Sequence, residues 1–123
     1  MNAIIKLGKY FFLLPFLAFG VMHLASADSM SGMVPAYMPG GVLWVYISGI
    51  GMALFAVSIL IGKYDKLAAI LAVVLLLLYI VIVHIPSMAT NQMAMVSILK
   101  DLGLCGACLM YADKFAKDAS IIG

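Results

Sequence analysis

The stretch ILKDLGLCGACLMYA, residues 98–112, carries two charged residues inside an otherwise apolar segment. On a helix that turns about 100° per residue, Asp101, Cys105 and Cys108 fall on one stripe, and Lys100 lies beside it. A charged side chain inside a membrane helix costs about 3 kcal/mol or more unless it is paired or hydrated. The stretch therefore predicts a membrane-spanning helix whose charged residues belong to a functional site.

The composition of the whole chain indicates an integral membrane protein. Its 123 residues are 67% hydrophobic and 10% charged, with neither arginine nor glutamate, whereas a soluble domain is nearer half apolar and a quarter charged. We therefore expect the lipid bilayer as a partner. Nucleic acid is excluded as a partner because the chain has no basic cluster. Both cysteines lie in one segment, which is not the pattern of a disulfide framework.

Four apolar runs are each long enough to cross a bilayer, since about 20 helical residues span the 30 Å hydrocarbon core. We place the spans at about residues 4–25, 42–61, 67–85 and 93–111, with Pro86 ending the third. Glycine, proline and polar residues separate the runs. The sequence therefore predicts one domain over residues 1–123, an all-α membrane protein folded as an antiparallel four-transmembrane-helix bundle.

Pairs of lysines predict the orientation of this bundle. They precede the first span, separate the second from the third, and follow the fourth: Lys6 and Lys9, Lys63 and Lys66, Lys114 and Lys117. Four spans bring all three pairs to one side, which the positive-inside rule makes cytoplasmic, together with both termini.

The first run has a second interpretation. Two lysines, an apolar stretch and the sequence ASA at residues 25–27 also resemble a cleaved signal peptide. The length of the run, and the Pro15 and His23 inside it, favour a retained span.

This topology brings four polar residues to a similar depth in the outer half of the bundle. His23 and His84 end the first and third spans, and Lys100 and Asp101 lie about two turns into the fourth. We therefore predict a cluster for ligand binding or proton exchange at His23, His84, Lys100 and Asp101. The alternative is structural: interfacial histidines, and a lysine and an aspartate that only satisfy packing partners.

The sequence CGAC at residues 105–108 has the spacing of a redox dithiol. A reactive thiol needs an accessible position that favours the thiolate, and these cysteines lie in the middle of an apolar helix. Packing is therefore the favoured role of Cys105 and Cys108, and a quinone-coupled dithiol is the weaker alternative.

Metal cofactors are disfavoured. Two histidines on facing helices could ligate a haem, and methionines near histidine suit Cu(I). However, only two of the four spans carry a histidine, one in each, and methionine is also a common apolar filler. We predict no metal site.

Several short motifs, in order and over most of the chain, resemble the DoxX/DoxD-like family of small four-helix membrane proteins. They are FGVMHL at residues 19–24, MVPAYMP at 33–39, WVYISG at 44–49, KLAA at 66–69 and LKDLGLCG at 99–106. Relatives often carry an acidic residue after the glycine of the second span. This chain has GIGMA at 49–53, so the resemblance transfers no carboxylate role to that span. The resemblance implies a multi-pass protein of a bacterial inner (plasma) membrane.

Three classes of function follow. The first is a membrane subunit of a quinone-linked or oxidative-stress oxidoreductase complex, with other membrane subunits as partners and no catalysis by this chain alone. The second is an assembly or chaperone-like interaction protein without catalysis. The third is a small transporter, which is disfavoured because the chain has no glutamate and no acidic residue between Lys9 and Ala27. A quinone is the cofactor considered first.

Overall fold

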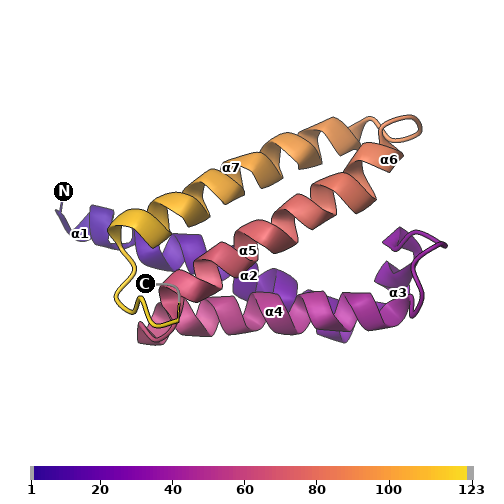
Figure 1. Cartoon of the computed structure of the whole chain (residues 1–123). Coiled ribbons are helices and arrows are strands. Elements are labelled where there is room, and N and C mark those ends of the chain that lie inside the picture. The colour runs from indigo at the N-terminus through magenta and orange to yellow at the C-terminus, as the bar shows by residue number, and fades with distance from the viewer. Residues whose placement is uncertain (1, 122–123) are drawn as a thin grey trace.

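The computed structural model describes residues 2–121, and the regular structure of this part of the chain is entirely helical, with no strand (Figure 1). Four helices are long and apolar enough to cross a membrane. They span Asn2–Ala25, Val42–Ile61, Asp65–Ser87 and Met93–Lys114. The predicted number of helices and their approximate positions are confirmed.

The shorter elements lie around and within these four helices. The first long helix consists of α1 (Asn2–Lys6) and α2 (Gly8–Ala25), and the second is α4 (Val42–Ile61). The third consists of α5 (Asp65–Leu78), the π-helix η2 (Tyr79–His84) and α6 (Ile85–Ser87), and the fourth is α7 (Met93–Lys114). Between α2 and α4, the expected loop contains α3 (Ala27–Met30) and the 3-10 turn η1 (Ser31–Met33).

The expectation that Pro86 ends the third helix is wrong. The chain stays helical through Pro86 to Ser87. Just before it, the N–H of Ile85 donates to the carbonyl of Ile80, a hydrogen bond over five residues that defines the π-turn. Pro86 then occupies the first turn of α6, where a missing N–H and a fixed φ cost little. The π-turn thus lets the helix continue past the proline.

The helices pack as two pairs, α2 with α4 and α5 with α7, and α4 joins the pairs by packing on α5 (Figure 1). Glycines bring α2 and α4 close together. A Cβ atom on Gly49 would lie 2.7 Å from the Cβ of His23 and 3.0 Å from the carbonyl oxygen of Gly20. Small residues at such contacts are typical of membrane helix pairs. The contact thus pairs Gly20 of α2 with Gly49 of α4.

An aromatic cluster fills the core where the two pairs meet. The rings of Phe16 and Phe55 pack edge to face with centroids 4.5 Å apart, and Phe12 lies 5.7 Å from Tyr111. Such edge-to-face pairs add about 0.5–1.5 kcal/mol beyond the burial of their area. Because Phe12 and Tyr111 come from α2 and α7, the cluster connects the first helix to the last.

A buried carboxylate fastens the C-terminal segment to the start of α5. Asp65 is fully buried and accepts hydrogen bonds from the hydroxyl of Tyr111 at 2.8 Å and from the backbone nitrogens of Lys117 and Asp118, both at 2.9 Å. In return, the N–H of Tyr64 donates to the Asp118 carboxylate at 2.7 Å. Hydrogen bonds to that carboxylate, first from the Ser120 hydroxyl, lower the pKa of Asp118. The sequence indicated only a polar turn over residues 62–66.

Candidate functional site

A cavity of about 370 Å³ lies between the two helix pairs, near the end of α2 and the start of α7. We call it the polar cavity. Its walls include aromatic and apolar side chains, among them Phe16, Phe19, Trp44 and Met52, and seven polar side chains. The polar side chains are His23, Ser48, Tyr79, His84, Ser97, Lys100 and Asp101. This volume and this mixture of walls are typical of small-molecule sites.

All four residues that the sequence grouped as a polar cluster line this cavity. His23 comes from α2, His84 from the last position of η2, and Lys100 and Asp101 from α7. Residues that are far apart in the chain are therefore brought together. Their role in binding or proton exchange stays a prediction.

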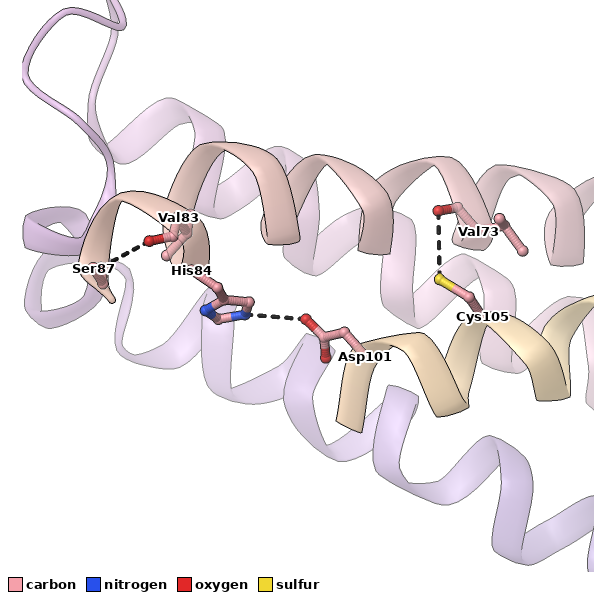
Figure 2. A network of polar contacts seen from close by, with 6 residues as sticks. All are labelled: Val73, Val83, His84, Ser87, Asp101 and Cys105. Carbon is pink, nitrogen blue, oxygen red and sulfur yellow. Dashed lines mark hydrogen bonds and ion pairs between the residues drawn. The ribbon is translucent and has the colours of Figure 1, made fainter. Parts of the chain in front are cut away.

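His84 and Asp101 form the closest polar pair of the cavity. The Nε2 atom of His84 lies 3.0 Å from Oδ2 of Asp101, as Figure 2 shows. Asp101 is only 4% exposed. A carboxylate in an apolar environment needs a hydrogen-bonded or charged partner, and the imidazole of His84 supplies one. The pair can therefore hold one proton at the cavity wall.

Tyr79 also lines the cavity, although it is not among the residues of the predicted polar cluster. Its hydroxyl is buried and makes no hydrogen bond of standard geometry within residues 2–121, with the side chain of Ser48 on α4 nearby. Tyr79 and His84 are the first and last residues of the π-helix, and both line the cavity. On an α-helix, residues five apart diverge by about 140°, whereas the wider π-turn brings them to one side. The position of Tyr79 in the cavity wall therefore depends on the π-turn and cannot be predicted from helical spacing in the sequence.

His23 stacks on Tyr79 across the cavity, with ring centroids 6.5 Å apart and an angle of 16° between the planes. Its Nδ1 atom lies 2.6 Å from the carbonyl oxygen of Phe19. A carbonyl only accepts, so this contact assigns the proton of Nδ1 and leaves Nε2 as the acceptor of the neutral ring. When the ring is protonated, Nε2 becomes a donor.

Lys100 has no carboxylate partner within 4.0 Å among residues 2–121. Its Nζ atom lies 5.6 Å from the centroid of the Phe19 ring on α2, which is a cation–π distance. The neighbouring Asp101 turns to His84 instead, since adjacent residues on a helix point in different directions. The ammonium group therefore contacts an aromatic ring and forms no ion pair within the described residues.

The two cysteines lie in the hydrophobic core rather than in the cavity wall. Cys105 and Cys108 are buried free thiols, and the sulfur of Cys105 lies 3.9 Å from the carbonyl of Val73 on α5 (Figure 2). Both pack in the hydrophobic core, between α7 and the other long helices. Whether they ever act as a dithiol stays a prediction.

Burial predicts slow chemistry at these thiols. In the folded protein in mild detergent, N-ethylmaleimide should modify Cys105 and Cys108 at least about tenfold more slowly than a cysteine placed at the exposed Ser29, because only local opening admits the reagent. Intact-mass spectrometry over time measures this, and dissolving the protein in SDS should make both thiols react. Rapid native modification of either thiol would contradict their placement in the core.

The donor set of the cavity suits an organic ligand better than a metal ion. Within the described part of the chain, no three histidine, cysteine, aspartate or glutamate residues are grouped closely enough to hold a metal. The cavity instead combines aromatic walls with an ammonium group, a free hydroxyl and an imidazole–carboxylate pair. This arrangement can stack a planar ring and donate hydrogen bonds to oxygens on its edge.

A comparison with protein families matches residues 13–101 to a domain of unknown function, DUF8561. No curated protein and no solved structure matches the chain. The match includes every residue of the polar cluster, from His23 to Asp101, and its description assigns no activity. The resemblance to DoxX-like proteins stays a prediction.

Proposed function

Because the chain belongs to the DUF8561 family, whose function is unknown, we propose a function from the polar cavity: this is a DoxX-like multi-pass membrane protein that binds a quinone headgroup. We assign it the role of a membrane subunit in a quinone-linked or oxidative-stress oxidoreductase complex. Catalysis then requires the partner subunits. The observation that supports the proposal is that the ammonium group of Lys100 forms no ion pair and the hydroxyl of Tyr79 forms no hydrogen bond within the described residues.

We further propose that the chain forms an antiparallel bundle in a bacterial inner membrane, with both termini in the cytoplasm. Three contacts between the third long helix (α5 and η2) and α7 support this direction: Asp65 with Tyr111, Val73 with Cys105, and His84 with Asp101. As the residue number rises along one helix, it falls along the other. The lysine pairs lie near the end of the bundle that contains Asp65, and the positive-inside rule makes that end cytoplasmic. The polar cavity then lies in the outer half.

The chemistry of the cavity matches a quinone headgroup. Its two carbonyl oxygens are acceptors on opposite edges of a planar ring. The ammonium group of Lys100 forms no ion pair and the hydroxyl of Tyr79 forms no hydrogen bond within residues 2–121. Aromatic side chains such as Phe19 and Trp44 provide walls for the ring.

The imidazole–carboxylate pair supplies the proton chemistry. Reduction of a quinone to a quinol takes up two electrons and two protons. The pair of His84 and Asp101 can hold one proton beside the ring and release it to one quinone oxygen, then take up a second proton from the aqueous phase at this end of the bundle and release it for the other oxygen. Lys100 stabilises negative charge that develops on that oxygen. The electrons come from a partner redox protein, which explains why we assign this chain the role of a subunit.

The single tryptophan of the chain provides a direct binding test, because Trp44 lines the cavity. We expect 2,3-dimethoxy-5-methyl-1,4-benzoquinone, which has a headgroup and no long tail, to quench Trp44 fluorescence saturably in lipid nanodiscs. Lys100→Met should raise its Kd about 10- to 150-fold, since a hydrogen bond from a charged group contributes about 1.5–3 kcal/mol. Tyr79→Phe should raise it about fivefold.

Lys63→Met is the matched control for this test, because Lys63 lies in the turn at the far end of α4. Its Kd should equal that of the wild type. Circular dichroism confirms that each variant is folded. Quenching that is linear in quinone concentration, and equal in all variants, would contradict the proposal and favour a non-catalytic interaction protein.

A further inference from the structure

Lys100 occupies an unusual position at the border of the polar cavity. It lies seven residues after Met93, about 10 Å along α7 from the start of the helix. It lines the cavity and is also exposed, whereas its neighbour Asp101 is 4% exposed. The ammonium group is therefore at the mouth of the cavity rather than in its interior.

Phe19 forms the other side of this mouth. It lines the cavity from α2, it is 40% exposed, and its ring lies 5.6 Å from Nζ of Lys100. The cavity therefore reaches the surface of the protein between α2 and α7. On the opposite wall, Val45 and Met52 of α4 are each 6% exposed and the hydroxyl of Tyr79 is buried. Trp44 of α4 and Leu78 of α5 also line the cavity and are 38% and 48% exposed, so it is the ammonium group of Lys100, and not exposure alone, that distinguishes the side between α2 and α7.

In a bilayer, a mouth between α2 and α7 opens sideways to the acyl chains. Water-soluble molecules reach that depth poorly, but an amphiphile dissolved in the membrane diffuses to it directly. The cavity volume of about 370 Å³ is at the low end of the range for ligand sites, so it holds a ring but not a long hydrocarbon chain as well.

We propose that the ligand is a quinone with a long apolar tail, which enters from the bilayer and whose tail leaves the cavity between Phe19 of α2 and Lys100 of α7. This inference rests on the proposed function and specifies the class of substrate and its route. Lys100 holds the headgroup at the mouth, and this contact offsets the cost of an unpaired ammonium group at membrane depth.

Photo-crosslinking tests the route. The probe is a quinone with the same headgroup and a ten-carbon tail that carries a diazirine at its far end, illuminated with the full-length protein in nanodiscs. Peptide mass spectrometry then locates the adducts. We expect adducts on residues 17–22 of α2 or 96–103 of α7, which an excess of unlabelled decyl-tailed quinone suppresses at least about tenfold.

Three results would overturn the inference: suppressible adducts on Leu78 or α4, suppressible adducts on residues 34–39, or no suppressible adduct at all. The tailless quinone separates this failure from that of the proposed function. If it quenches Trp44 saturably while the tail reacts elsewhere, only the route is wrong. If it does not bind, the proposed function fails as well.

Discussion

Replacing Asp65 with alanine is expected to lower the free energy of unfolding by about 3–5 kcal/mol, because within residues 2–121 the buried carboxylate is the acceptor for the buried hydroxyl of Tyr111 and for two partly buried backbone nitrogens. The hydroxyl of Tyr111 and the backbone nitrogens of Lys117 and Asp118 would each lose a charge-assisted hydrogen bond. Leaving such a group without a partner costs about 1–3 kcal/mol, and refilling by water offsets part of the sum.

The same change should release the C-terminal segment from the turn before α5. Trypsin should then cleave after Lys117 faster than in the wild type, before the helices unfold, because cleavage tracks local opening. Titration with SDS, followed by circular dichroism, measures the global effect. Tyr111→Phe removes one donor and keeps the ring, so it should cost only about 1 kcal/mol.

Asp113→Ala is the matched control. Asp113 is exposed and lies 3.5 Å from the exposed Lys114, an ion pair that contributes little. Its unfolding curve should overlay that of the wild type. Equal curves for the Asp65 and Asp113 variants would show that the buried carboxylate does not hold the segment in place.

Replacing Gly49 with alanine is expected to destabilise the protein by about 1–3 kcal/mol through overpacking. The added Cβ would lie 2.7 Å from the Cβ of His23 and 3.0 Å from the carbonyl oxygen of Gly20. Both obstacles are at the backbone or next to it, so α2 and α4 must move apart. Because His23 lies at this contact, the change should also weaken quinone binding.

Gly51→Ala provides the control on the same helix. No atom lies within 4 Å of a Cβ placed there, and alanine favours a helix over glycine by up to about 1 kcal/mol. This variant should therefore be as stable as the wild type or slightly more stable in thermal unfolding. If the Gly49 variant kept the wild-type Tm, the close approach of the two helices would be refuted.

The positions of the four long helices follow from the sequence alone, because apolar runs of about 20 residues have few other stable structures. The composition of the chain also makes its unusual residues easy to identify. In an apolar sequence, His23, His84, Lys100 and Asp101 are recognisable as rare polar residues, and their positions in the runs place them at one end of the helices. The sequence alone does not determine which residues they contact.

Those contacts depend on long-range packing, which only the tertiary structure decides. The π-turn adds Tyr79 to the cavity by changing the rotation between two residues five apart, an effect that depends on helix geometry rather than residue type. Asp65 appears in the sequence as an ordinary turn residue and is fully buried because a segment more than fifty residues later folds back on it. Gly20 of α2 matters for packing because it lies against Gly49, which is on another helix. Sequence patterns report local periodicity and composition. Which residues far apart in the sequence contact one another is determined only when the chain folds.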